Sequence, residues 1–399
     1  MAQKKENIVM FPFMAQGHIN PFLALALRIE KTKKFTITFV NTPLNIKKLR
    51  SFLPSNSSIH LLEIPFNSSD HDLPPNSENM DSLPYHFLIN LFQASLSLKP
   101  HFRKLISNLI HQQKWTENEE IDKLGLTYFR RKFGRQVWPV GPVLLTLGSQ
   151  ARSRRDFGIS PEECKNWLDK KPSCSVIYVS FGSMNTISAS QMMQLAMALE
   201  GCGKNFIWVV RPPLGFDINS EFRANEWLPE GFEEKIKVSG RGLLVRKWAP
   251  QVQILSHKSL SAFLSHCGWN SVLESLSHGV PMIGWPVAAE QSYNVKLLED
   301  TIGVCVEVAR GKRSEVFHED IVEKIKLVMN ESEKRKEMRE RALQIKEIIN
   351  NAIENEENFK GSSMEAMDQF LNAALKLRGE DKGKIHGAPS SSYEEKYYI

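Results

Sequence analysis

One short passage of the sequence gathers residues that could bind a negatively charged group. The segment SHCGWNSVLESLSHGVP, from Ser265 to Pro281, mixes histidine, glycine, asparagine, serine and glutamate. The residues before it, Ser259 to Leu264, alternate and are apolar enough for a buried strand, and apolar residues at helical spacing follow. The polar cluster therefore falls on a strand-to-helix turn, where free N–H groups and the positive end of the helix dipole favour anions.

The residue types in this turn indicate a diphosphate site. Gly268 lets the backbone approach a ligand closely, His266 can donate from its ring, and Asn270 and Ser271 add further donors. An alternative is that Ser271 and Glu274 form a capping box, which stabilises a helix by roughly 1 kcal/mol. The residues alone leave both interpretations open.

Polar and aromatic residues also follow two neighbouring predicted strands. KWAPQ places Trp248 and Gln251 after one strand, and WPVAAEQ places Glu290 and Gln291 after another. Because ligands of an open α/β sheet bind at the carboxyl ends of its strands, these residues are expected to meet in one crevice. An indole face can stack on a nucleobase, although a tryptophan beside a proline also occurs as ordinary packing.

Length and composition restrict the class of protein. The 399 residues exceed one ordinary core and suffice for two α/β domains. Lys and Arg number 51 against 45 Asp and Glu, and this mild net charge of +6, without an arginine-rich tract, argues against nucleic-acid binding. The five cysteines lack C-x-x-C spacing, so they predict neither disulfides nor zinc and favour a cytoplasmic location. No stretch predicts an integral membrane segment.

Hydrophobic periodicity predicts two α/β halves. Three strands are expected in the first half: NIVMFPF, FTITFV and IHLLEIPF. Six more are expected in the second half, enough for a Rossmann-like sheet: SVIYVSFGS, NFIWVVR, GLLVRKWAP, SLSAFLSHC, PMIGWP and VCVEV. The first helix, NPFLALALRIEK, is expected to have Asn20 as N-cap and Pro21 as first residue. A charged helical region is expected from about Ser332 to Leu377.

The stretch WAPQVQILSHKSLSAFLSHCGWNSVLESLSHGVPMIGWPVAAEQ, from Trp248 to Gln291, closely resembles the signature of plant uridine-diphosphate (UDP)-dependent glycosyltransferases. FPFMAQGHINPFLALA and WLDKKPSCSVIYVSFGS resemble the same family, so the likeness runs to about Leu377. It implies an α/β fold of the GT-B type, in which two Rossmann-like, doubly wound domains face a cleft. It also implies that a UDP-sugar is the donor substrate, that no cofactor is used, and that a small molecule with a hydroxyl is the acceptor.

The resemblance assigns roles residue by residue. Trp248 would stack on uracil, Gln251 would lie beside the base and ribose, and Glu274 would accept from the ribose hydroxyls. The remaining assignments are diphosphate contacts from Ser183, His266, Asn270 and Ser271, a place near the sugar for Trp269, and sugar hydroxyl contacts from Glu290 and Gln291. A glutamine at the last position favours glucose over galactose in the family. Where family members often have tryptophan this sequence has Ala288, which alters one wall of the sugar pocket.

His18 resembles the catalytic base of the family. It follows the first strand, and the positive end of a helix dipole would keep its ring neutral and able to accept a proton. A turn histidine that satisfies backbone groups is the alternative. The implied reaction is an inverting transfer that requires no metal.

An internal block of the first domain is expected to be missing. The family has a strand whose terminal aspartate hydrogen-bonds the base, whereas this chain passes from KLISNLIHQQ directly to KWTENEEIDKLG. Asp122 lies in a hydrophilic run and is not assigned that role. The acceptor pocket is therefore expected to be incomplete, catalysis to be impaired, and apolar faces of the first strands to be exposed or repacked.

The predicted organisation has four parts. These are an acceptor-side domain (1–142), a linker (143–160), a UDP-sugar-binding domain (161–378) and a disordered tail (379–399). The predicted activity is transfer of a sugar, glucose, from a UDP-sugar to a small lipophilic plant metabolite by a monomer. The alternative is a non-catalytic protein of the same family that binds a UDP-sugar or a partner. A sugar-nucleotide epimerase fits the signature poorly.

Overall fold

The computed structural model describes residues 6–84, 87–106, 137–143, 158–356 and 359–381. Contacts divide the chain into two units: Met1–His111 with Val143–Asn350, and Gln112–Pro142 with Asn351–Ile399. Both parallel sheets belong to the first unit. The domain bounds expected from the sequence stay a prediction, and most of the expected linker and tail lies outside the described residues.

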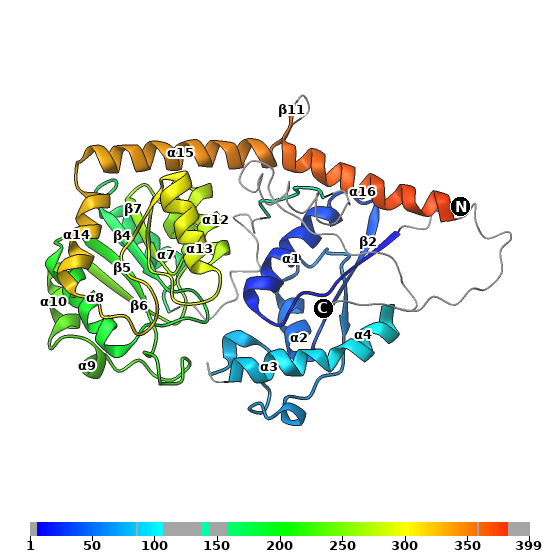
Figure 1. Ribbon diagram of the computed structural model, residues 1–399, viewed down its shortest axis with the longest axis horizontal. Coiled ribbons are helices and arrows are strands. Elements are labelled where there is room, and N and C mark those ends of the chain that lie inside the picture. The colour runs from blue at the N-terminus through cyan, green and yellow to red at the C-terminus, as the bar shows by residue number, and fades with distance from the viewer. Residues whose placement is uncertain (1–5, 85–86, 107–136, 144–157, 357–358, 382–399) are drawn as a thin grey trace. The chain divides into compact units, whose positions relative to one another are not determined.

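A six-stranded parallel sheet forms the larger half of the first unit (Figure 1). Its strands are β4 (Val176–Ser180), β5 (Asn205–Val210), β6 (Gly242–Arg246), β7 (Leu260–Ser265), β8 (Met282–Gly284) and β9 (Cys305–Glu307). The order β6-β5-β4-β7-β8-β9 reverses direction between β4 and β7, as in a Rossmann fold. All six strands expected in this half are confirmed.

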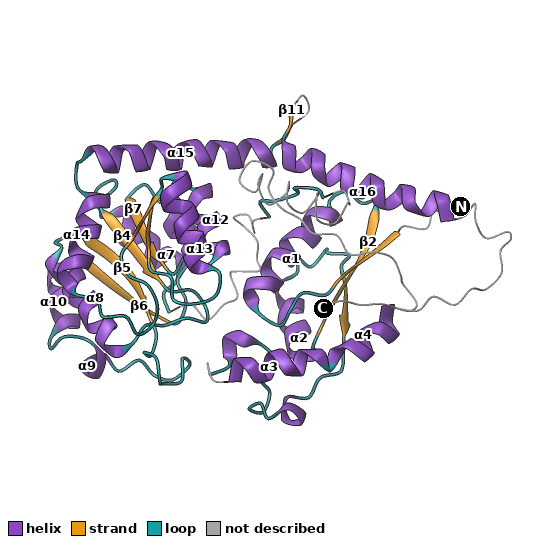
Figure 2. Ribbon diagram, in the orientation of Figure 1, coloured by secondary structure: helices purple, strands orange, loops and turns teal. Residues whose placement is uncertain are grey.

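Helices cover both faces of this sheet, as Figure 2 shows in purple around the orange strands. They are α7 (Pro161–Asp169), α8 (Ala189–Gly201), α9 (Ala224–Trp227), α10 (Phe232–Ser239), α11 (Gln251–Ser256), α12 (Trp269–Ser277), α13 (Gln291–Lys296), the π-helical turn η4 (Leu297–Ile302) and α14 (His318–Met329). The core beneath them includes Trp208, Phe232 and Trp285, each at most 1% exposed. A fully covered parallel sheet of this kind gives the loops at its carboxyl edge a rigid base.

The smaller sheet has three parallel strands in the order β1-β2-β3: β1 (Glu6–Met10), β2 (Phe35–Asn41) and β3 (His60–Glu63). The helices α1 (Gln16–Glu30) and α2 (Pro43–Phe52) connect them. Two 3-10 turns and two helices follow: η1 (Ser68–His71), η2 (Met80–Ser82), α3 (Leu88–Leu96) and α4 (Leu98–Ile106). Within the described residues β1 pairs on one side only, with β2, so it is an edge strand of this sheet.

Aromatic rings from the segment after β1 pack against α3 and α4. Phe11 lies 4.5 Å from the ring of Phe102 on α4, and Phe13 stacks at 4.9 Å on Phe92 of α3. Of the two expected outcomes, exposure or repacking, exposure does not occur at β2, which is buried at six of its seven positions. It holds in part for β1, where Ile8 and Val9 are half-buried.

The second unit is described over short segments. Its described elements are the C-terminal end of α15 (Glu333–Ile353), the two-stranded β10 (Asn355–Glu356) and β11 (Phe359–Lys360), and α16 (Ser362–Asp381). The ring of Trp138 meets that of Phe370 edge-on at 5.7 Å, and the hydroxyl of Ser363 donates to the carbonyl of Gly141. The long helices confirm the helical region expected before the tail. None of the described helices has the length and apolar composition of a membrane span.

Candidate active site

The polar turn between β7 and α12 is built to leave a helix N-terminus uncovered. Cys267 has a left-handed backbone (φ 59°), and Gly268 is the N-cap of α12 without any side-chain cap. The first N–H groups of α12 therefore have no side-chain acceptor at the cap, as an anion site requires. Ser271 and Glu274 lie inside α12, so the capping-box interpretation is wrong.

His266 is a buried, neutral ring in this turn. It is 8% exposed, and burial lowers its pKa to about 4. Gly182 and Gly268 lie directly against the ring, since a Cβ on either residue would come within 2.6 Å of it. At neutral pH His266 can therefore offer a phosphate one N–H group and no positive charge.

Two residues expected to bind the nucleoside, and one expected to bind the diphosphate, are brought together by hydrogen bonds. The Nε2 of Gln251, at the start of α11, donates to Glu274 Oε2 at 2.9 Å and to Ser271 Oγ at 3.4 Å. The hydroxyl of Tyr178 on β4 donates to Gln251 Oε1 at 3.2 Å. This arrangement fixes the Gln251 amide and the Glu274 carboxylate side by side, while their contacts to UDP stay predictions.

Trp248 carries a cation on one face of its ring. It follows β6, and the guanidinium carbon of Arg211, which follows the adjacent β5, lies 4.8 Å from the ring centre. Arg211 also donates from Nη1 to the backbone carbonyl of Ser183. The sequence reasoning missed Arg211, although a charged residue directly after a buried strand is the same signal that His266 gives after β7.

Glu290 and Gln291 follow β8, and their side chains differ in accessibility. Glu290 is exposed, whereas Gln291 is 5% exposed. The Oε1 of Gln291 accepts from the backbone N–H groups of Val287 at 2.9 Å and Ala288 at 3.0 Å. Its oxygen thus shapes the loop, and its NH₂ group is what remains to donate to a sugar. Trp269 begins α12 and is partly exposed.

His18 lies in the first turn of α1. The helix begins at Gln16, so the expectation of Asn20 as N-cap and Pro21 as first residue is wrong. The helix can begin earlier than expected because Asp81, from a distant part of the chain, accepts the backbone N–H of Gln16 at 2.8 Å. A distant carboxylate thus takes the place of a local capping side chain.

Pro21 inside α1 leaves a backbone carbonyl of this helix free to accept a hydrogen bond from a residue of α12. Proline lacks an N–H group, so the carbonyl of Gly17, four residues earlier, has no helical donor. The Nδ2 of Asn270 donates to this carbonyl at 2.8 Å. Asn270 therefore contacts the turn that carries His18, and its expected contact with diphosphate stays a prediction.

The ring of His18 is accessible, and two carboxylates act on it. Protein around the ring lowers its pKa below 6.5 by desolvation, while the charges of Glu290 and Asp81 oppose this shift. Phe13 meets the ring edge-on at 5.6 Å. The described residues provide no hydrogen bond to the ring, so the turn-histidine alternative gains no support. A neutral ring near pH 7 suits a general base.

Asp81 is the second residue that sequence reasoning missed. Its carboxylate accepts from Ser183 Oγ at 2.8 Å as well as from the backbone of α1. No local pattern around it predicts a site, because it is a single aspartate in a turn 63 residues after His18. Asp122 lies outside the described residues, and the expected phosphate contact of Ser183 stays a prediction.

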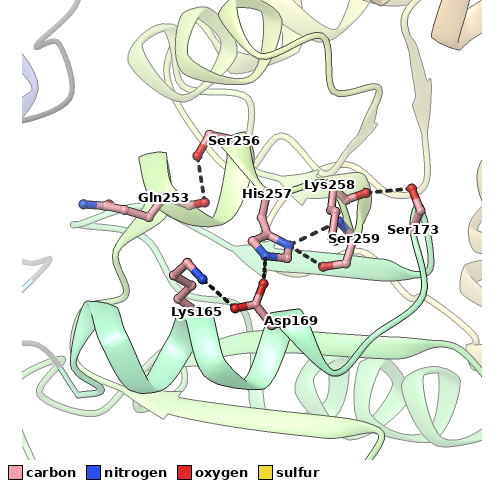
Figure 3. Close-up of polar contacts among 8 residues, drawn as sticks. All are labelled: Lys165, Asp169, Ser173, Gln253, Ser256, His257, Lys258 and Ser259. Atoms are coloured by element: carbon pink, nitrogen blue, oxygen red, sulfur yellow. Dashed lines mark hydrogen bonds and ion pairs between the residues drawn. The ribbon is translucent and has the colours of Figure 1, made fainter.

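Figure 3 shows another histidine and carboxylate in contact. His257 is hydrogen-bonded through Nε2 to Asp169 at 3.1 Å and through Nδ1 to Ser259 Oγ at 2.8 Å. Ser259 is fully buried, so its hydroxyl cannot meet a substrate. This cluster joins α7 to the start of β7 and is a packing contact.

The described residues contain no group of three or more histidines, cysteines or acidic residues that could hold a metal ion. All five cysteines are free thiols, and only Cys174 is not buried. Burial raises the pKa of the Cys164 thiol to about 12, which keeps it protonated and unreactive.

Comparison with protein families identifies the class of this chain. It matches the model of UDP-glucoronosyl and UDP-glucosyl transferases over residues 83–346 and the model of the glycosyltransferase N-terminal domain over residues 5–115. The first match spans more than half of the chain. The protein therefore belongs to the UDP-glycosyltransferase family and is a glycosyltransferase.

Relatives and solved structures agree. UDP-glycosyltransferase 92A1 of Arabidopsis thaliana is 44% identical over 494 positions, which cover 96% of this chain and all of the relative. Crocetin glucosyltransferase 3 of Crocus sativus is 35% identical and covers 83% of this chain and 92% of its own length. The structure of Glycyrrhiza uralensis UGT73P12 has a TM-score of 0.77 and an identity of 22%, and the match covers 95% of this chain and 98% of that one. The structure of Arabidopsis thaliana UGT89C1 with UDP-L-rhamnose has a TM-score of 0.75 and an identity of 25%, and the match covers 93% and 99% of the two chains. The expected GT-B fold is confirmed.

The first alignment also shows that this chain lacks positions that the relative has. Its 494 positions exceed the 399 residues of this chain by 95. Because the match covers the whole relative and nearly the whole chain, the unmatched positions lie within the sequence and not at its ends.

Proposed function

We propose that this protein transfers glucose from UDP-glucose to a hydroxyl of a small lipophilic plant metabolite, with inversion and with His18 as base. The observation that carries the proposal is the hydrogen bond from Asn270 Nδ2 to the Gly17 carbonyl at 2.8 Å, since it joins a residue expected at the diphosphate to the neighbour of the expected base. A base placed beside the sugar site is what direct displacement requires.

The reaction would proceed in one displacement. A ring nitrogen of His18 takes the proton of the acceptor hydroxyl as the oxygen forms a bond to the anomeric carbon. The bond from that carbon to the diphosphate breaks, its electron pair leaves with UDP, and the configuration inverts. The N–H groups at the start of α12 and one N–H of His266 would stabilise the charge on the leaving group.

Glucose as the donor sugar is supported by the buried Gln291 and by the name of the Crocus sativus relative, a glucosyltransferase. A structural neighbour was solved with UDP-L-rhamnose, so donor choice is an open variable of this fold. A donor series of UDP-glucose, UDP-galactose and UDP-L-rhamnose, compared by kcat/KM, tests the proposal. A preference for either of the other two sugars would contradict it.

A small acceptor is supported by the apolar wall beside the base. Phe13 lies against His18 and stacks on Phe92, whose side chain is 53% exposed. One structural neighbour, UGT89C1, was solved with quercetin. Phenolic and terpenoid alcohols are therefore the acceptors to screen first.

The missing block favours a second candidate, a protein that binds a UDP-sugar without transferring it. Two measurements on the same sample distinguish the transferase from this second candidate. They are a calorimetric titration with UDP-glucose and an assay of UDP release with the acceptor panel. Release that disappears in His18→Ala and persists in His60→Ala, an exposed histidine on β3, supports the transferase. Binding without release supports the second candidate, and absence of binding contradicts both.

A further inference from the structure

A turn far from His18 in sequence is anchored to the start of α1. In η2 the backbone N–H of Met80 donates to the Met14 carbonyl at 2.9 Å, and Asp81 Oδ2 accepts from the Gln16 N–H at 2.8 Å. The Asn79 side chain accepts the N–H of Asp81 at 3.0 Å, which fixes the turn itself. The Asp81 carboxylate is therefore held beside Gln16, the residue two positions before His18.

The larger sheet holds the other oxygen of this carboxylate. Ser183, which follows β4, donates from Oγ to Asp81 Oδ1 at 2.8 Å, and Arg211 donates to the Ser183 carbonyl. The charge of Arg211 also interacts with that of Asp81. Both oxygens of Asp81 thus have donors, and a cation balances the charge.

We propose that Asp81 is the positioning carboxylate of His18: it holds the first turn of α1 in place and stabilises the imidazolium that forms when His18 takes the acceptor proton. This role rests on the proposed function, in which His18 is the base. The resemblance to the family assigns that role to an aspartate on a strand that the sequence of this chain does not predict.

Asp81 acts through the helix and through its charge, and not through a bond to the imidazole. Its two oxygens are taken by Gln16 and Ser183, whereas its charge and that of Glu290 are the ones that raise the pKa of His18 against desolvation. Arg211 offsets part of this effect, because it faces Asp81. A nearby opposite charge favours the protonated histidine.

The test separates the effect of the negative charge of Asp81 from the effect of its hydrogen bonds. Asp81→Asn keeps an oxygen that can accept from Gln16 and removes the charge, whereas Asp81→Glu keeps the charge. The pKa of His18 is measured by NMR titration of protein with ¹³C-labelled histidine, its signal being assigned with His18→Gln. Asp70→Asn, on the exposed turn η1, is the matched control.

In Asp81→Asn the pKa of His18 should fall, because a charge that raises it is removed, and the acid limb of the kcat/KM profile should move to lower pH by the same amount. Asp81→Glu should restore part of both shifts, and Asp70→Asn should change neither. A His18 pKa that is the same in wild type and Asp81→Asn overturns the proposal. Absence of UDP release from the wild type overturns the proposed function instead, and the NMR result is read independently of it.

Discussion

The two sheets of the first unit differ in how completely they are built. The six-stranded sheet buries every residue of β4 and β7, whereas β3 has no fully buried residue and β1 is a half-buried edge. The larger sheet, which carries the residues proposed to bind UDP and is called the nucleotide side below, packs on its own core. The side that carries His18 also has a core, and hydrogen bonds from Ser183 and Asn270 join it to the loops of the larger sheet. The larger sheet thus keeps a Rossmann strand order and a buried centre in a chain that lacks positions of its relative.

The largest expected effect is a loss of sugar transfer without a loss of UDP binding. His18→Ala should lower kcat/KM for transfer by about 10²- to 10⁴-fold, because general base catalysis contributes that much. The dissociation constant for UDP should be unchanged, since the residues proposed to bind UDP follow strands of the other sheet. Steady-state kinetics and calorimetry measure the two quantities. A parallel loss of UDP binding would show that the sides are not separable.

Core truncation should separate the two sheets by stability. Phe263→Ala removes a fully buried ring that stacks at 4.8 Å on Tyr178, and should lower the free energy of unfolding by about 3–5 kcal/mol. Leu62→Ala on β3 removes a half-buried side chain and should cost about 1 kcal/mol. Hydrogen exchange of amides in each sheet reports the two effects separately. Equal losses would mean that the smaller sheet is as well packed as the larger one.

His266 should make the stability of the nucleotide side depend on pH. Because its pKa is lowered from 6.5 to about 4, the unfolded chain binds a proton between these values and the folded chain does not. The free energy of unfolding should thus be unaffected above pH 6.5 and fall by up to about 3 kcal/mol as the pH drops to 4. Urea unfolding of wild type and His266→Asn measures this contribution. The same slope in both proteins would contradict it, and His60→Asn is the control.

The smallest expected effect concerns the bond from Asn270 to the Gly17 carbonyl. Asn270→Ala should destabilise the protein by about 1 kcal/mol. In a Pro21→Ala background residue 21 has an N–H group that can occupy this carbonyl, so the same change should cost less. A double-mutant cycle measures the difference as a coupling energy. Strict additivity would mean that the bond contributes nothing.

Strand patterns predicted the sheet of the nucleotide side well because its strands are short apolar runs separated by clear turns. The sequence also predicted that residues at the carboxyl edge of this sheet lie together, and Gln251 is indeed hydrogen-bonded to Ser271 and Glu274. The start of α1 could not be predicted, because its N–H is capped by Asp81 from a distant turn. A contact between residues 65 positions apart leaves no periodic trace in the sequence.

The central claim is that the nucleotide side is complete without the missing block. Calorimetric titration of the wild-type chain with UDP tests it most directly, with Glu274→Gln as the variant that removes a charged acceptor for the ribose hydroxyls. The account predicts saturable binding at a single site, weakened roughly tenfold or more in Glu274→Gln and unchanged in His18→Ala. Absence of UDP binding by the wild-type chain would contradict it.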